Sequence, residues 1–203
     1  MLNLLTIKKM FMHTVSLTAT GADKLQQTAY TYSLVVALPH FVQQMLRQQQ
    51  AFFTAQYGYV CGAPRLCIAH FTAHEAMEDT LLRYLQRIAG MQHALSVTLN
   101  NYSSIPEHSI YVRVQQPVCF QQWIQALQPI DNYISDNGFP HLQTMQRAHI
   151  PLAAALPPKV YRKAVSHYAQ QVFYASFMAT EWVLLKCKNS YSNEVPLCKF
   201  HLL

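Results

Sequence analysis

Apolar positions with two different periods divide the chain into expected strands and helices. Residues 30–38 are rich in β-branched and aromatic side chains, a composition typical of a strand. Pro39 then suits the first turn of a helix, which we expect to end near Gly58. A second strand is predicted over residues 66–72. The clearest amphipathic helix covers residues 75–88, where the apolar positions repeat at spacings of three and four: Met77, Leu81, Tyr84, Leu85 and Ile88.

The second half of the chain continues the alternation of short strands and helices. Pro117 is expected to begin a helix that Pro129 ends or kinks, because proline lacks the amide hydrogen that a helix interior needs. The other elements expected are strands over 94–99 and 108–114 with a turn over 100–104 between them, a turn over 136–138, extended chain over 139–147, a helix from Pro157-Pro158 to 168, a single long strand over 173–188, a turn over 191–196 and a last strand over 197–203.

This order of elements predicts an α+β fold with antiparallel hairpins among the later strands. The two halves are similar in plan, since each gives strand, helix, strand, helix and strand and each offers one histidine from a strand. We therefore expect two half-sized units of strands and helices within residues 29–203. Residues 1–28 are expected to be a disordered leader, because their apolar stretch is too interrupted by polar residues for a secretory signal.

The composition excludes several classes of protein. Hydrophobic residues make up 51% of the 203 residues, which excludes disorder as the main state, and no apolar stretch is long enough to span a membrane. Charged residues make up only 12%, with a net charge of +6 that gives a mild preference for anionic partners. The five cysteines are odd in number and include no Cys-x-x-Cys pair, which indicates a reduced, cytoplasmic protein with buried thiols and no zinc site.

Two strand histidines carry the chemical hypothesis. Residues i and i+2 of a strand share a face, so His70 is expected beside Thr72, and His141 beside Gln143. A hydroxyl or amide donates to a phosphate oxygen, while an imidazole gives or takes a proton near neutral pH. Two such units facing each other would supply one general acid and one general base.

A purely structural interpretation of the first unit competes with this hypothesis. Thr72 and Glu75 have the spacing of a capping box, in which the threonine serves the following helix and His70 is an ordinary strand-end residue.

Several segments together resemble the 2H phosphoesterase superfamily, in particular its bacterial 2'-5' RNA ligase and cyclic phosphodiesterase branch. Ile68-Ala69-His70-Phe71-Thr72 resembles the first His-x-Thr motif of that family, and Phe139-Pro140-His141-Leu142-Gln143-Thr144 resembles the second, which is usually followed by a nearby arginine. The opening strand and its proline, residues 32–39, and the closing hairpin, residues 179–186 and 199–202, are also similar.

The resemblance implies a single bilobal domain over residues 29–203, with two related lobes of antiparallel sheet and helices outside. It also implies a central cleft between the lobes, where His70 and His141 meet. It implies hydrolysis of 2',3'-cyclic or 2'-5' phosphodiester bonds in an RNA end or nucleotide, or the reverse ligation, with no metal or other cofactor. One histidine would deprotonate water or the 2'-oxygen, the other would protonate the leaving oxygen, and the threonines would hold the phosphate.

The second motif departs from the family pattern, because Gln143 stands where the family has threonine or serine. Either the Gln143 amide replaces the hydroxyl, or a one-residue β-bulge returns Thr144 to the site. The bulge would also align Arg147, which lies six residues after His141 rather than about five. On this ground Thr144 is the predicted phosphate-binding partner of His141, with Arg147 beside it.

Two other functions remain open on the sequence alone. The same cleft would serve a binding protein that recognises a nucleotide or an RNA end without turning it over. Alternatively, the glutamine-rich helix faces over residues 43–50 and 115–128 would serve an interaction with another protein.

Overall fold

The computed structural model describes residues 28–115, 118–145, 147–188 and 194–203. The expected leader falls almost wholly outside these residues. So does the first half of the turn expected over 191–196, whereas residues 195 and 196 belong to the last strand.

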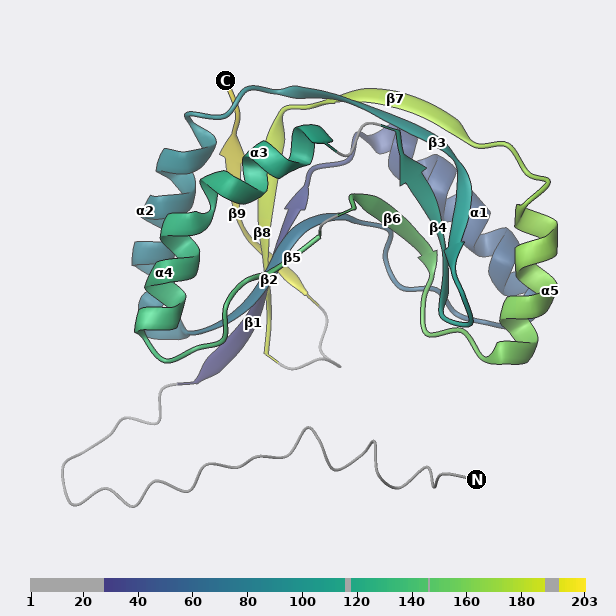
Figure 1. Ribbon diagram of the computed structural model, residues 1–203, viewed down its shortest axis with the longest axis horizontal. Coiled ribbons are helices and arrows are strands. Elements are labelled where there is room, and N and C mark those ends of the chain that lie inside the picture. Colours follow the sequence, from purple (N-terminus) through teal and green to yellow (C-terminus); the bar gives the residue numbers. More distant parts are fainter. Residues whose placement is uncertain (1–27, 116–117, 146, 189–193) are drawn as a thin grey trace, which may run out of the picture.

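Two antiparallel sheets form the centre of the molecule (Figure 1). The larger sheet has the strand order β5 (Gln143–Thr144), β2 (Leu66–His74), β1 (Ala29–Val36), β8 (Glu181–Cys187) and β9 (Val195–His201). The smaller sheet has the order β6 (His149–Ala153), β4 (Ser109–Val114), β3 (Leu95–Ile105) and β7 (Tyr174–Ala179).

The helices lie at the two flanks of an arch. A 3-10 turn, Glu75–Met77, leads into α2, and α2 (Glu78–Ala89), α3 (Val118–Ala126) and α4 (Gln128–Asp136) gather beside the larger sheet. At the opposite flank α5 (Pro158–Tyr168) lies beside the smaller sheet. In Figure 1, α1 (His40–Tyr57) lies behind the strands of this smaller sheet. This arrangement confirms the expected α+β class with antiparallel sheets and helices outside.

One large apolar core joins the two sheets to the helices. It includes Leu34 of the larger sheet and Val112 of the smaller one, both fully buried. Trp123 of α3 and Trp182 of β8 meet edge to face within it, with ring centroids 5.3 Å apart. Because strands of both sheets contribute to the same core, the sheets are held in a fixed relation by hydrophobic burial.

The boundaries of α1 agree with the prediction from proline and glycine. Pro39 precedes the first helical residue, and Gly58 ends the helix with φ 66°, a left-handed conformation that glycine adopts without strain. The amide of Gly58 donates to the carbonyl of Thr54 at 2.8 Å.

The turn predicted over residues 100–104 is wrong, because β3 continues to Ile105. Asn101 adopts φ 57°, and the register with β4 shifts between Leu99 and Tyr102. Asparagine tolerates the left-handed region better than most residues, so a bulge at this point bends the strand without ending it. The chain turns after Ile105 instead.

The single long strand predicted over residues 173–188 is also wrong. It is two strands, β7 and β8, which are separated at Thr180 and belong to different sheets. Two further elements, β6 and α4, were not expected from the sequence. Pro129 does end α3, since it occupies the first turn of α4, where proline costs no hydrogen bond.

Candidate active site

His70 lies in the middle of β2, between two neighbouring strands. Ser33 of β1 and Gln143 of β5 are its direct partners across the sheet. Directly paired residues share a face, so these three side chains form one row across three strands. The hydroxyl oxygen of Ser33 is 2.9 Å from Nδ1 of His70, which fixes that end of the ring.

A β-bulge in β2 brings Cys67 to the same face. The pairing with β1 shifts by one residue, because Leu34 pairs with Ala69 but Val35 pairs with Cys67. Ile68 and Ala69 are both buried in the core, so Cys67 and His70 share the other face although they are three residues apart. The sulfur of Cys67 is 3.1 Å from Nε2 of His70.

The surroundings of His70 favour a neutral imidazole. Burial lowers its pKa, and the positive charge of Arg65 lowers it further. Arg65 forms an ion pair with Glu194, whose carboxylate also accepts a hydrogen bond from the Ser33 hydroxyl at 3.4 Å. Burial raises the pKa of the Cys67 thiol to about 12, so its partner at Nε2 is a neutral S–H group.

The second motif keeps strict alternation, and the bulge expected there is absent. Ala69 pairs with Thr144, and the amide of Met145 continues the ladder by donating to Ile68 at 3.2 Å. Leu142 packs against the main core, whereas Met145 packs against a small cluster that contains Cys67. The predicted re-aiming of Thr144 is therefore wrong: Gln143 shares the face of His70, and Thr144 lies on the opposite face. The bulge that the site does have is in β2, before the first histidine.

The pairing of β2 with β5 brings the two motifs side by side. His70 stands opposite Gln143, and Ala69 stands opposite Thr144. β5 begins at Gln143, so His141 and Leu142 lie just before the paired residues. Phe71 and Leu142, the middle residues of the two motifs, both contact the main core.

Asp131 holds the backbone and side chain of the second motif. One carboxylate oxygen is 3.0 Å from Nδ1 of His141, and the other accepts the amide of Leu142 at 2.7 Å. The His141 side chain is 74% exposed, so its Nε2 end is open to a ligand while Nδ1 is engaged.

The capping interpretation of Thr72 is not supported. Strand β2 runs on to His74, and His74 is the residue that precedes the 3-10 turn, with no side-chain cap hydrogen bond. Thr72 instead pairs with Thr31 of β1 and is half-buried. Arg147 lies beyond the end of β5 and is exposed.

Sequence reasoning missed four residues of this site: Ser33, Cys67, Asp131 and Glu194. Two of them had a visible signal. Ser33 is the one polar residue in the run Ser33–Leu38, and Asp131 follows Pro129 at the start of a helix, where acidic residues are favoured. Cys67 had none, because its place beside His70 depends on the bulge.

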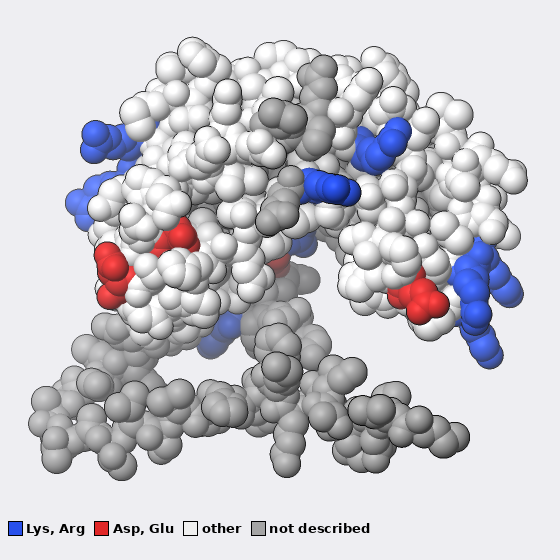
Figure 2. All heavy atoms as spheres, viewed as in Figure 1, with Lys and Arg blue, Asp and Glu red and all other residues white. Residues whose placement is uncertain are grey.

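Charged side chains are sparse around this fold. On the face seen in Figure 2, Lys and Arg are separated by wide neutral surface and form no continuous basic stripe. Among the described residues, no group of three or more His, Cys, Asp or Glu side chains is arranged to hold a metal ion. Within the same residues, no helix combines the length and apolarity that a membrane span requires.

Comparison with solved structures identifies the fold. E. coli LigT in complex with 3'-AMP superposes with a TM-score of 0.60 at 16% identity, covering 86% of this chain and 98% of that one. TT0787 of Thermus thermophilus gives 0.63 at 16% identity, covering 85% and 97%. A structure described as a phosphoesterase gives 0.55 at 17% identity, covering 87% and 98%. No protein-family model matches the chain, and no curated protein matches it in sequence.

The chain is therefore folded like E. coli LigT and like the structure described as a phosphoesterase. The resemblance of its two histidine motifs to those of the 2H phosphoesterase superfamily is consistent with this fold.

Proposed function

We propose that the protein is a phosphodiesterase that acts on 2',3'-cyclic or 2'-5' phosphodiester bonds of an RNA end or nucleotide, or catalyses the reverse ligation. The observation that carries the proposal is the register of β2 against β5. It pairs His70 with Gln143 and so brings the two motifs together at one edge of the larger sheet. Continued by two residues, the same register would set Thr72 opposite His141, and an approximate twofold axis would relate the two motifs. A phosphate on that axis would have one imidazole and one neutral donor on each side.

In the direction of hydrolysis, His70 acts as the general base. Its lowered pKa keeps it neutral at neutral pH, the state in which it accepts a proton. With Nδ1–H donated to the Ser33 hydroxyl, Nε2 carries the lone pair. Water or the attacking hydroxyl displaces the Cys67 thiol from Nε2, because a thiol is a weak hydrogen-bond donor.

His141 then acts as the general acid. Its Nε2–H gives a proton to the oxygen that leaves phosphorus as the new P–O bond forms. Asp131 positions the ring by accepting the hydrogen on Nδ1. Hydrolysis leaves His70 protonated and His141 neutral, and proton exchange with solvent restores both.

Thr72 and Gln143 are the proposed phosphate donors, because they occupy corresponding places in the two motifs. Arg147, which lies just beyond the end of β5, is proposed to contact the same phosphate. Thr144 would reach the phosphate only if the local pairing changed, since the register places it on the other face.

The solved relatives support a nucleotide-like ligand. LigT has been crystallised with 3'-AMP, NADP+ and ATP, which all carry ribose and phosphate. A phosphate-binding pair of imidazoles also agrees with the net charge of +6.

A non-catalytic binding protein is the second candidate. It is favoured by one observation, that both nitrogens of His70 have protein partners, Ser33 and Cys67. A resting site of this kind would bind a phosphate without offering a free base.

One assay distinguishes the two candidate functions. The purified protein is incubated with a panel of 2',3'-cyclic nucleotides and 2'-5' linked dinucleotides, in the presence of a chelator, and the products are identified. Turnover supports the enzyme. Saturable binding of the same compounds without product supports the binding protein, and the absence of both turnover and binding overturns both candidates.

A further inference from the structure

A hollow of about 670 Å³ lies beside the histidine site on the same side of the larger sheet. Its floor contains Val35 and Val183, and its walls include residues of α1, of the chain before β2 and of β9. This volume is within the range of pockets that hold small organic ligands.

The strand register shows that the floor of this hollow continues the histidine site. Cys67, Val35, Val183 and Lys199 are paired in turn across β2, β1, β8 and β9. The row beside it contains His70, Ser33 and Leu185. Neighbouring rows on one face are about 7 Å apart, so the hollow begins one row from the reactive imidazole.

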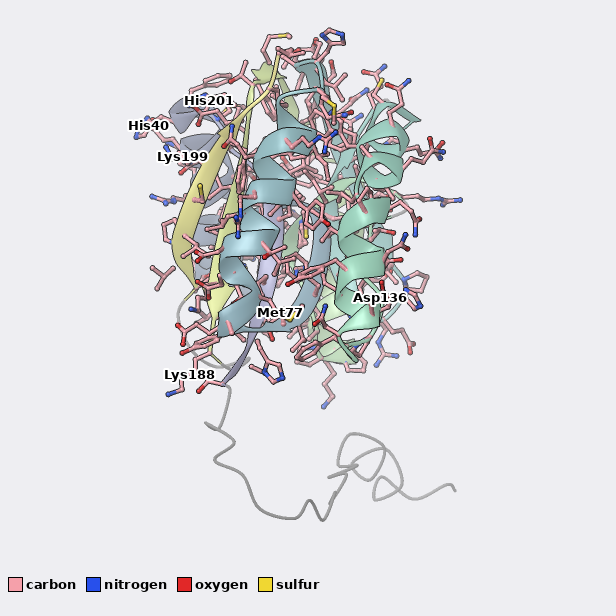
Figure 3. All side chains as sticks on the ribbon, turned by 90° about the vertical axis from the view of Figure 1, so that its left-hand side faces the viewer. His40, Met77, Asp136, Lys188, Lys199 and His201 are labelled. Carbon is pink, nitrogen blue, oxygen red and sulfur yellow. The ribbon has the colours of Figure 1, made fainter. Side chains whose placement is uncertain are left out.

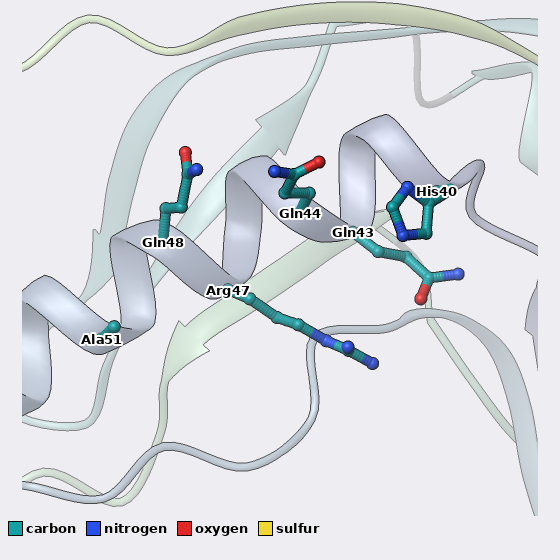
Figure 4. Close-up of a pocket in the computed structure, with 6 residues that line it drawn as sticks. All are labelled: His40, Gln43, Gln44, Arg47, Gln48 and Ala51. Atoms are coloured by element: carbon teal, nitrogen blue, oxygen red, sulfur yellow. The ribbon is translucent and has the colours of Figure 1, made fainter.

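Positive charge from three separate elements surrounds the apolar floor. Arg65 and Lys199 each have an acidic partner, since Arg65 pairs with Glu194 and Lys199 lies 4.0 Å from Glu181. Arg47 of α1 has no ion pair among the described residues. Figure 4 shows Arg47 and Gln43 projecting from one side of α1, away from Gln44 and Gln48. Figure 3 places Lys199 on β9, toward the same end of the molecule as His40 at the start of α1.

We propose that this hollow binds the nucleotide next to the reacting one, with its phosphate at Arg47 and Lys199 and its ribose or base on Val35 and Val183. The inference rests on the proposed function and adds a substrate class to it. The preferred substrate is an oligonucleotide with at least two phosphates rather than a cyclic mononucleotide. Aliphatic side chains contact a ribose or base without reading its identity, so the hollow selects for chain length and not for sequence.

The test compares two substrates that differ by one nucleotide. Michaelis constants are measured for a 2',3'-cyclic mononucleotide and for a 5'-phosphorylated dinucleotide that ends in the same cyclic phosphate. Arg47→Gln is expected to raise the Michaelis constant of the dinucleotide about tenfold and that of the mononucleotide less than twofold, with kcat unchanged. Lys199→Gln should act in the same direction. Lys163→Gln, at an exposed position of α5, is the matched control and should change neither Michaelis constant.

A binding measurement keeps this inference separate from the proposed function. Dissociation constants are titrated for the 3'-phosphorylated mononucleotide and for the 3'-phosphorylated dinucleotide that also carries the 5'-phosphate, and neither measurement needs turnover. The dinucleotide should bind more tightly, and Arg47→Gln should lower the slope of its log Kd against log salt by about 0.7, the value for one phosphate contact on a single strand. Tighter binding of the dinucleotide without turnover would contradict the proposed phosphodiesterase activity but would support the proposed nucleotide site in the hollow. Equal binding of both lengths, or an unchanged slope in Arg47→Gln, would overturn the inference.

Discussion

Cys67 and His70 are three residues apart in β2, yet they lie on one face with Sγ 3.1 Å from Nε2. A regular strand would place them on opposite faces. The bulge at Ile68 and Ala69 is what brings them together, and it makes a neutral thiol the resting partner of the nitrogen that we assign as the base.

Replacing this thiol by a stronger donor should inhibit the enzyme. Cys67→Ser puts a hydroxyl at the same place, which competes better for Nε2, so kcat/KM should fall several-fold. Cys67→Ala removes the competitor and should leave kcat/KM equal to or above that of the wild type. Steady-state kinetics of the two variants measure this, and a larger loss in the alanine variant would contradict the account of the resting site.

The second motif should improve when it is made to match the first. Gln143 lies on the face of His70, so Gln143→Thr introduces a hydroxyl at the position that corresponds to Thr72, and turnover should rise. Thr144→Ala is the matched control, and its loss of activity should be less than twofold because Thr144 lies on the other face. A large loss in Thr144→Ala with no change in Gln143→Thr would show that the bulge forms when substrate binds.

Asp131 is a positioning residue for His141, and its effect should be on kcat. Asp131→Asn keeps the shape but loses the carboxylate that selects the Nδ1–H form of the ring, so kcat should fall at least about tenfold with little change in the Michaelis constant. Asp131→Glu should recover part of the rate if the carboxylate is what matters. Equal losses in both variants, accompanied by a lower melting temperature, would assign Asp131 to structure alone through its bond to the Leu142 amide.

The pH dependence should report His70. Burial and Arg65 both lower its pKa, so the acid limb of kcat/KM should lie below the usual histidine pKa of about 6.5. Arg65→Gln removes the positive charge, which should raise the pKa and move this limb to higher pH. Arg162→Gln, on exposed α5, should leave the profile unchanged. A shift of the limb to lower pH in Arg65→Gln would contradict the assignment of His70 as the base.

How much of the fold was predictable differs from element to element. Pro39 and Gly58 marked α1 because each acts locally, through a fixed φ or a left-handed cap. The division of residues 173–188 between two sheets was not predictable in this way. β7 and β8 are both rich in apolar residues, and which sheet each one joins depends on partners far away in the sequence.

The candidate site was likewise predictable from the sequence only in part. The alternation of Gln143 and Thr144 followed from the sequence, since Gln143 pairs with His70 and Thr144 pairs with Ala69. The expectation that moved Thr144 to the face of His70 was wrong. That expectation relied on the family spacing to Arg147, whereas the pairing of Thr144 and Met145 with β2 holds the regular register. Ser33 and Asp131 come from elements whose contacts with the histidines arise only in the folded chain.

The glutamine-rich face of α1 is partly structural. Gln50 is buried, and its amide donates to the carbonyls of Gly62 and Leu152. Gln44 and Gln48 line a shallow hollow on the surface of α1, shown in Figure 4. An interaction with another protein through this helix would therefore rely on fewer free glutamines than the sequence suggests.

The most direct measurement of the central claim is the activity of the single variants His70→Ala and His141→Ala on the 2',3'-cyclic substrate. Each should lose a factor of ~10²–10⁴ in kcat, the usual contribution of a general acid or base, while keeping the melting temperature and circular dichroism of the wild type. A chelator should change none of these rates. Full activity in either folded variant would contradict the proposal that the two histidines act together on one phosphate.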